Sequence, residues 1–320
     1  MEFDFLYKSA HDILKRAKSV LLVAHRKPDG DAVGSTAAIV NWCAKEGIAV
    51  TPFCADPVPS QFMYMRGAER YTTDLAEFGR GHDVVMVCDS GDLRYAGIAE
   101  HMSGMRHGPV VLNFDHHATN ELYGDINIVD PKASSASEIV YRFLRHVRAE
   151  IDQDIATCLL TGILTDTGNF SNPATTRSSM EAASHLLRRG ARLHDVARNT
   201  LRNKSVGSLR LWGAVLSRLK YNERLGVAST AIFVRDIDAG ADSEQVEGVS
   251  NFLNANLDAK VIMVLKEMPD GTVRGSLRSA DDVDVSELAK VMGGGGHKKA
   301  AGFSIPGRIV ELEDGWKVEG

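Results

Sequence analysis

The stretch "VLNFDHHATN" (residues 111–120) joins an apolar run to a carboxylate and two imidazoles. Its apolar beginning, which continues from Val110, is typical of a strand inside a sheet. The run ends in Asp115, His116 and His117, three side chains that can bind a metal or move a proton. The pattern therefore predicts a buried strand whose polar end carries chemistry.

Two other apolar runs end in the same way. Residues 20–24 (VLLVA) lead into "HRKPDGDAVGS", and residues 83–88 (DVVMVC) lead into "DSGD". These runs lack polar alternation and are separated by helical patterns such as residues 31–45, which predicts an α/β fold with a parallel sheet covered on both faces. The carboxyl ends of parallel strands meet at one edge of a sheet, where ligands bind. We therefore expect these polar ends to converge in space.

The converging side chains form a set that suits metal ions. A fourth stretch, "GILTDTGNF", ends an apolar helical pattern with Asp166, which we expect at the same edge. Several carboxylates in one pocket repel one another unless cations neutralise them. Mixed carboxylate and imidazole ligands favour Mn²⁺, with Mg²⁺, Co²⁺, Fe²⁺ or Zn²⁺ as alternatives, and the set is large enough for two ions that share a carboxylate. The predicted metal ligands are His25, Asp29, Asp31, Asp89, His116 and Asp166.

Each of these residues also has an ordinary structural explanation. An Asp after a strand commonly forms a turn or caps a helix, and Asp31 is in position to cap the helix that follows it. A single His is more often a hydrogen-bonded polar residue than a ligand. These explanations do not predict the same polar ending on three strands, so the joint pattern favours a metal site.

A polar connector follows Gly190, and the chain changes character from about Leu219. A strand-like run at residues 227–234 is followed by "VIMVLKE" and "TVRGSLRS", which flank a Pro269-Asp270-Gly271 turn and predict a hairpin. We expect a first domain at residues 1–190, a linker at 191–215 and a smaller α/β domain at 216–320.

Composition limits the class of protein. The chain has 320 residues, 44% of them hydrophobic, and its 37 Lys and Arg against 42 Asp and Glu give a net charge of −5. This charge argues against binding to long nucleic acid, although a local basic pocket suffices for a small nucleotide. No apolar run approaches the ~20 residues of a membrane span, and the N-terminus lacks the features of a signal peptide. With four cysteines and no CxxC pair, we expect a cytoplasmic protein that has no membrane partner.

The motifs, taken together and in order, resemble those of a known family. "HRKPDGDAVGS", "CDSGD", "FDHHATN" and "GILTDTGNF" are similar to the four motifs of the DHH phosphoesterases. "GSLRS" and "GGGGHKKAAG" are similar to the DHHA1 type of C-terminal domain, and the strongest likeness is to the nanoRNase (oligoribonuclease) and pAp-phosphatase group. The resemblance implies a parallel-sheet DHH domain with flanking helices, a smaller α/β DHHA1 domain and an active site in the cleft between them.

The resemblance also implies a role for each ligand candidate. His25 and Asp29 hold one metal, Asp31 and His116 hold the other, and Asp89 bridges both. By the same resemblance, Asp166 completes the second metal site and lies near the nucleophilic water. Asp115 orients a neighbouring imidazole. His117 faces the substrate phosphate as a hydrogen-bond donor or general acid.

In the second domain, the resemblance implies that substrate is bound by Arg278, His297 and the glycines Gly294, Gly295 and Gly296. Glycines let backbone N–H groups approach an anion, and Arg suits bidentate binding of phosphate. The alternative interpretation of the run of glycines is a flexible linker, but the following "AAGFSI" reads as a strand.

We expect a two-metal phosphodiesterase that hydrolyses very short RNA oligonucleotides and dinucleotides to nucleoside 5′-monophosphates. Hydrolysis of 3′-phosphoadenosine 5′-phosphate (pAp) is an expected second activity, and relatives suggest a homodimer. Cyclic dinucleotides remain an alternative substrate. The "GGGGH" stretch argues against an inorganic pyrophosphatase, and the negative net charge argues against an exonuclease that acts on long strands. Every metal-ligand position is filled, which argues against a non-catalytic nucleotide sensor.

Overall fold

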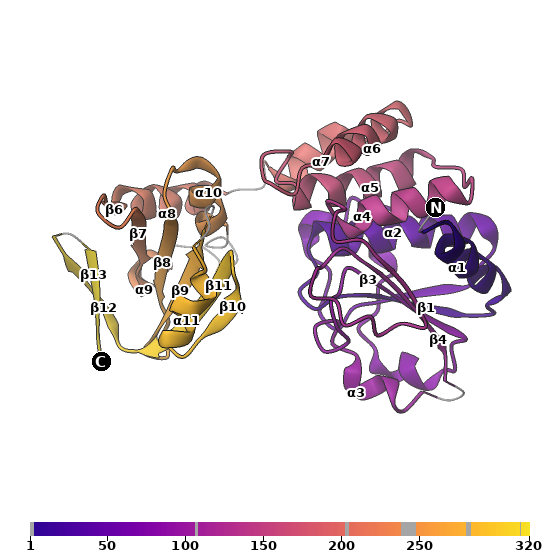
Figure 1. Ribbon diagram of the computed structural model, residues 1–320, viewed down its shortest axis with the longest axis horizontal. Coiled ribbons are helices and arrows are strands. Elements are labelled where there is room, and N and C mark those ends of the chain that lie inside the picture. The colour runs from indigo at the N-terminus through magenta and orange to yellow at the C-terminus, as the bar shows by residue number, and fades with distance from the viewer. Residues whose placement is uncertain (1–2, 106–107, 202–204, 238–247, 280–282, 314) are drawn as a thin grey trace. The chain divides into compact units, whose positions relative to one another are not determined.

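The computed structural model describes residues 3–105, 108–201, 205–237, 248–279, 283–313 and 315–320, and the chain forms two compact units that divide between Asn203 and Lys204 (Figure 1). Each unit has a sheet and hydrophobic cores of its own. Among the described residues, no helix has the length and apolar character needed to cross a membrane.

The sheet of unit 1 has five strands, and every neighbouring pair is parallel, as the sequence predicts. Its strand order is β2-β1-β3-β4-β5. The strands predicted from the apolar runs are present, whereas the edge strand β5 is half-buried and has no comparable apolar signal. The strand bounds are β1 Val20–Ala24, β2 Val50–Phe53, β3 Val84–Cys88, β4 Val110–Asp115 and β5 Ile126–Val129.

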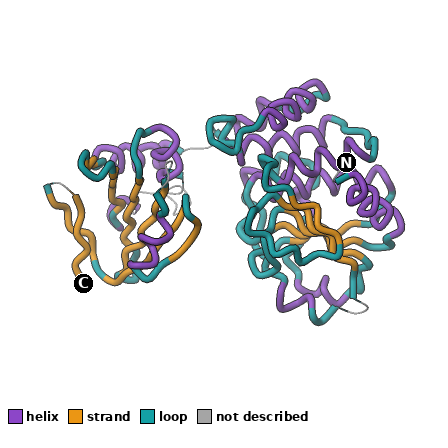
Figure 2. Tube along the Cα trace, viewed as in Figure 1, coloured by secondary structure: helices purple, strands orange, loops and turns teal. Residues whose placement is uncertain are grey.

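Long helices cover one face of this sheet, above the strands in Figures 1 and 2. The helices of unit 1 are α1 Asp4–Arg16, α2 Gly30–Glu46, α4 Ala136–His146, α5 Gln153–Asp166, α6 Arg177–Arg188 and α7 Leu193–Thr200. α2 ends at Gly47, whose left-handed φ of 69° lets it cap the helix. α2 and α5 are in close contact at Gly34, where a Cβ would lie 2.5 Å from the Cys158 carbonyl oxygen. This helical layer holds the C-terminal end of α5 beside the sheet edge.

The second face of the sheet is covered differently. Its core includes Val23, Val87 and Phe78, the last from the short 3₁₀ helix η3 (Leu75–Gly79), and the four-residue α3 (Ala99–Met102) lies beside η3. The expectation that both faces are buried is therefore confirmed, but turns and one short helix cover this face. Two further 3₁₀ helices, η1 (Ser60–Phe62) and η2 (Ala68–Arg70), follow β2.

The main sheet of unit 2 has six strands in the order β10-β11-β9-β8-β7-β6, and its neighbouring pairs are antiparallel except β7 with β8. The predicted hairpin is present, since β8 and β9 join through a turn in which Gly271 has a φ of 79°. A separate hairpin, β12 with β13, follows. The bounds are β6 Lys220–Asn222, β7 Val227–Ile232, β8 Val261–Glu267, β9 Thr272–Arg278, β10 Gly295–His297, β11 Ala300–Pro306, β12 Arg308–Leu312 and β13 Gly315–Glu319.

Helices pack on both faces of the unit 2 sheet. One core contains Leu211 of α8 and Leu253 of α10, and the other contains Ala289 of α11. The segment 191–215, expected as a linker, contains α7, whose Val196 is buried in the unit 1 core, and most of α8. The helix bounds are α8 Val206–Ser217, α9 Val234–Ile237, α10 Val249–Asn256 and α11 Val285–Val291.

Candidate metal centre

The carboxyl edge of the unit 1 sheet gathers the predicted ligands. His25 follows β1, Asp89 follows β3 and His116 follows β4, so three neighbouring parallel strands deliver one residue each. Asp89 leaves its strand in a left-handed conformation with a φ of 62°, which turns the chain sharply at the strand end. Asp166 is the last residue of α5 and arrives at the same edge from the helical layer.

Asp89 lies between two imidazoles. Its Oδ2 is 3.5 Å from His25 Nε2, and its Oδ1 is 3.4 Å from His116 Nε2. Both distances are longer than a good hydrogen bond. The side chain is almost wholly buried, and its Oδ1 has no hydrogen-bond partner among the described residues. A buried carboxylate oxygen without a partner is costly, and a cation at this position would satisfy it.

His25, Asp29 and Asp89 form the first potential ligand group. His25 Nε2 lies 3.7 Å from Asp29 Oδ1, while His25 Nδ1 donates to the Arg26 carbonyl oxygen at 2.7 Å. Donation from Nδ1 leaves Nε2 as the lone-pair nitrogen, which is the form that binds a metal. Asp29 has a second role, because its Oδ1 accepts the N–H groups of Asp31 and Ala32 and so caps α2.

Asp31, His116 and Asp166 form the second group, in which His116 Nε2 lies 3.3 Å from Asp166 Oδ2. The structural explanation considered for Asp31, a cap on the following helix, is wrong, because Asp29 occupies that position. Asp31 is wholly buried and instead accepts the first N–H groups of α4, from Ala136 at 2.6 Å and Ser137 at 2.8 Å. These donors help to stabilise its buried negative charge.

Asp115 organises the remaining part of the motif. It is fully buried, its Oδ1 accepts the Nδ1–H of His117 at 2.7 Å and the backbone N–H of His116 at 2.8 Å, and its Oδ2 accepts Asn120 Nδ2 at 2.6 Å. The imidazole that it orients is therefore that of His117, whereas it contacts His116 only through the backbone. The side chain of His117 is 38% exposed, and in the described part of the chain no hydrogen bond engages its Nε2.

Sequence reasoning missed the amides that support Asp115. Asn113 Nδ2 donates to Asn120 Oδ1 and to Asn127 Oδ1, both at 2.9 Å, and Asn120 also donates to the Ser90 carbonyl oxygen at 3.2 Å. The available signal was Asn113, a polar residue inside an apolar run, together with Asn120 at the end of the same motif. A buried amide in a strand requires partners, and here it links β4 to the neighbouring strand β5 and to the Asn120 side chain.

The electrostatics of the cluster agree with a cation site. Burial and the charge of Asp89 raise the pKa of Asp31 to about 7, and burial and neighbouring carboxylates raise that of Asp166 well above its usual range. Burial opposes protonation of the imidazoles, but attraction to the adjacent carboxylates outweighs it and raises the pKa of His25 to about 12 and of His116 to about 10. The excess negative charge of the cluster thus favours bound protons in the metal-free protein, and divalent cations would neutralise the same charge. This set of carboxylate and imidazole donors fits ions such as Mn²⁺.

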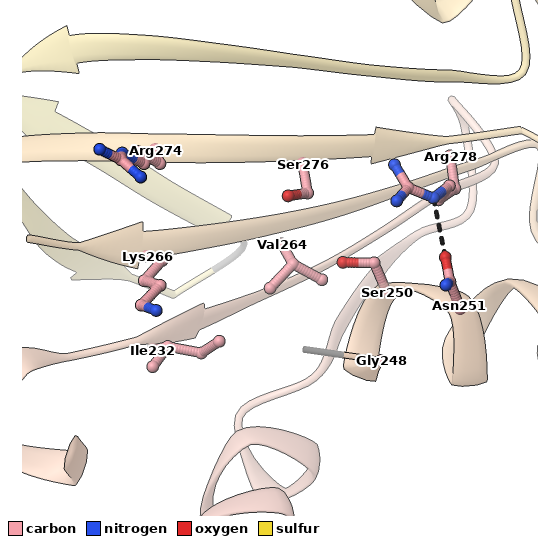
Figure 3. Close-up of a pocket in the computed structure, with 9 residues that line it drawn as sticks. All are labelled: Ile232, Gly248, Ser250, Asn251, Val264, Lys266, Arg274, Ser276 and Arg278. Atoms are coloured by element: carbon pink, nitrogen blue, oxygen red, sulfur yellow. Dashed lines mark hydrogen bonds between the residues drawn. The ribbon is translucent and has the colours of Figure 1, made fainter. Parts of the chain in front are cut away.

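The predicted substrate residues of unit 2 occupy two places. Arg278 ends β9, where its Nε donates to Asn251 Oδ1 at 2.9 Å. It lines a pocket of about 340 Å³ shown in Figure 3. Sequence reasoning missed two other basic residues of this pocket, Lys266 and Arg274. The lining residues are Ile232, Gly248, Ser250, Asn251, Val264, Lys266, Arg274, Ser276 and Arg278, named here as the unit 2 pocket.

The glycines that precede His297 have packing reasons for their identity. A Cβ on Gly294 would lie 2.1 Å from the Gly302 carbonyl oxygen, and Gly294 N–H already donates to Ala289 at the end of α11. Gly296 has a φ of 141°, and a Cβ there would meet β11. Gly295 is exposed, with open space where its Cβ would be. The side chain of His297 lies outside the described residues, although its backbone belongs to β10.

Comparison with known families matches both units. The DHH family, N-terminal domain, matches residues 19–163, and the DHHA1 domain matches residues 229–314. The first match contains every candidate ligand except Asp166, and the second contains the unit 2 pocket strands β8 and β9.

Individual relatives extend over most of the chain. A bifunctional oligoribonuclease and PAP phosphatase, NrnA, of Thermus thermophilus is 31% identical over 300 residues, which cover 92% of this chain and 87% of the relative. The protein of the same name from Bacillus subtilis is 24% identical and covers 90% of this chain and 89% of its own. Among solved structures, an exopolyphosphatase-related protein from Bacteroides fragilis has the same fold, with a TM-score of 0.87, 24% identity and coverage of 95% and 92%.

Proposed function

The chain belongs to the DHH family of metal-dependent phosphoesterases, and we propose that it hydrolyses very short RNA oligonucleotides and dinucleotides to nucleoside 5′-monophosphates. Hydrolysis of the phosphomonoester of pAp is the second activity in this proposal, in keeping with the names of the NrnA relatives. The observation that carries the proposal is the position of Asp89, whose two oxygens each face one imidazole of a separate ligand group.

In this proposal the two groups would hold two divalent metal ions, with Mn²⁺ the best fit, and Asp89 would be a ligand that they share. Bound ions supply a water of lowered pKa and neutralise charge on a phosphoryl oxygen. The protein's own contribution is to hold the carboxylates in place before substrate arrives. Asp29 is fixed by the N-terminus of α2 and Asp31 by that of α4.

His117 is proposed to contact the substrate phosphate and to donate a proton to the leaving oxygen. Its hydrogen bond to Asp115 raises the pKa of the His117 imidazole, which favours the protonated, donating form. Because Asp115 engages Nδ1, the proton available to substrate is the one on Nε2. Asp115 therefore positions His117 and does not itself meet the substrate.

The unit 2 pocket is proposed to bind the substrate's terminal phosphates. Arg274 and Arg278 are four residues apart on β9 and so point to the same face, with about 13 Å between their Cα atoms. Lys266 is the register partner of Arg274, so one end of the pocket carries two cations and the other carries Arg278 (Figure 3). No carboxylate forms an ion pair with these three residues in the described parts of the chain. Two separated basic ends suit a substrate that bears more than one phosphate.

The proposal is tested by parallel assays of linear pApA, linear pGpG, pAp, cyclic di-AMP and pyrophosphate with Mn²⁺ present. We expect release of nucleoside 5′-monophosphate from the linear dinucleotides and of phosphate from pAp. Asp89→Asn should abolish both activities, while Asp12→Asn, at an exposed Asp of α1, serves as the matched control. Release from pyrophosphate alone, or turnover of cyclic di-AMP with none of the linear forms, would overturn the substrate assignment. Bound metal without any turnover would point to a sensor.

A further inference from the structure

A second basic pocket lies in the helical layer of unit 1. It has a volume of about 370 Å³, is named here the arginine pocket, and is lined by Arg145, Arg148, Ala149, Ile151, His185 and Arg189. Arg145 belongs to the last turn of α4, Arg148 follows that helix, and His185 and Arg189 come from the end of α6. Segments that are distant in sequence therefore bring three guanidinium groups to one hollow.

These guanidinium groups lack acidic partners. Throughout the described residues, no carboxylate forms an ion pair with Arg145, Arg148 or Arg189. Two other arginines of the same helices are paired, since Arg142 contacts Asp130 and Glu138, and Arg177 contacts Glu181. The exposed Arg188 of α6 has no ion pair among the described residues, but it does not line the pocket. The arginine pocket is therefore the place where three unpaired guanidinium groups line one hollow.

His185 accepts from two of these arginines. Its Nε2 accepts from an Arg145 terminal nitrogen at 3.0 Å and from Arg189 Nε at 3.4 Å, which places the ring proton on Nδ1. That Nδ1 is buried and has no hydrogen-bond partner among the described residues. Burial and the adjacent guanidinium groups lower the pKa of His185, so the ring stays neutral beside them.

Basic residues at helix ends have a simpler explanation, because cations near a C-terminus offset the helix dipole. This explanation covers Arg145 and Arg189. It accounts for the basic residues of each helix end separately, but not for the convergence of the ends of α4 and α6 on one hollow. The three arginine side chains are exposed, so water screens part of their mutual repulsion, and a bound anion would offset the rest.

We propose that the arginine pocket binds a small phosphate-bearing anion. Guanidinium groups match phosphate oxygens in geometry and charge, and Ala149 and Ile151 give the pocket an apolar part that suits a nucleobase or ribose. The site is separate from the metal centre. The first residue of α4 donates to Asp31, whereas Arg145 lies nine residues further along, about 14 Å at the helical rise.

The test is titration of metal-free full-length protein with pyrophosphate and, separately, with adenosine 5′-monophosphate. Lys266→Gln, Arg274→Gln and Arg278→Gln are present in every sample to remove the cations of the unit 2 pocket. Calorimetry should show one site, and Arg145→Gln with Arg189→Gln should raise its Kd about a hundredfold, since each lost charge-assisted bond is worth roughly tenfold. Tighter binding of the nucleotide than of pyrophosphate would assign a contact to the base or ribose, and equal binding would assign recognition to the phosphate.

Arg148→Asn is a second variant that leaves both helices intact, and Asn tolerates the left-handed backbone at that position. Its Kd should also rise, while Arg177→Gln, at a paired arginine of α6, should leave the Kd unchanged. Dinucleotide hydrolysis by chains with a native unit 2 pocket should be unaffected by the changes at Arg145, Arg148, Arg177 and Arg189, which separates this site from the proposed active site. Absence of any binding, an unchanged Kd in the double variant, or an equal loss in Arg177→Gln would overturn the proposal.

Discussion

Replacement of Asp115 by Asn tests the proposed division of roles within the "DHH" motif. Asn keeps the size of the side chain but replaces one carboxylate oxygen with an amide that donates. Asp115 accepts three hydrogen bonds while fully buried, and one of its donors is the amide of Asn120 at 2.6 Å. In the variant, the new N–H₂ group either faces the N–H₂ group of Asn120 or, with the amide turned over, faces the donors of His116 and His117.

The magnitude follows from these contacts. One charge-assisted hydrogen bond is lost, worth about 1.5–3 kcal/mol, and a buried donor is left without a partner, which costs about 1–3 kcal/mol. Partial relaxation reduces the sum, so we expect Asp115→Asn to lower the free energy of unfolding by about 3 kcal/mol. Urea denaturation of the metal-free protein measures it. Asp125→Asn is the matched control, because Asp125 accepts the Val111 N–H in an exposed position and should cost less than about 1 kcal/mol.

The same variant should slow catalysis by about a hundredfold or more, because His117 loses the acceptor that fixes its proton. Adding Asn120→Asp to this variant places a carboxylate oxygen at residue 120 opposite the new amide at residue 115. The double variant should therefore recover part of the stability but little of the rate. A loss of stability no larger than in Asp125→Asn would refute the hydrogen-bond reasoning. Full recovery of rate in the double variant would refute the role given to Asp115.

Three other outcomes are expected. His116→Ala should lose bound Mn²⁺, whereas His117→Ala should keep it and lose rate about 10²–10⁴-fold; equal metal loss in calorimetry would contradict the roles given to the two residues. In the metal-free protein, the pKa of His116 is raised from 6.5 to about 10. The protonated imidazole of His116 therefore stabilises the folded state fully below pH 6.5, and this contribution disappears as the pH rises through 10. The free energy of unfolding should therefore fall, and Mn²⁺ affinity should rise, between about pH 7 and 10; pH-independent values of both would contradict this. Gly162→Ala should destabilise unit 1 by about 1–3 kcal/mol, because its Cβ would lie 1.9 Å from Ser137 Oγ and 2.5 Å from Asp31 Oδ1, while Gly213→Ala, in open space on α8, should be neutral or stabilising in thermal unfolding.

The apolar runs were sufficient to predict the strands β1, β3 and β4 and the helix α2. β1 and β3 are buried along their whole length, and β4 and α2 along most of theirs, so the pattern of side chains reflects the environment directly. The edge strand β5 and the β12–β13 hairpin were missed because they are only partly buried, and their sequences carry little periodic signal.

The sequence by itself determined which residues meet at the candidate metal centre, because a parallel sheet places every carboxyl end at one edge. Only the tertiary structure decided what each residue contacts there. Asp31 accepts hydrogen bonds from the N-terminus of α4, and Asp115 accepts one from the ring of His117. Lys266 lies beside Arg274 because the two residues are register partners on β8 and β9. Convergence follows from topology, which local patterns encode. A hydrogen bond such as that between Asp31 and Ala136 depends on the packing of α2, α4 and α5 to within a fraction of an ångström, and no local pattern records that.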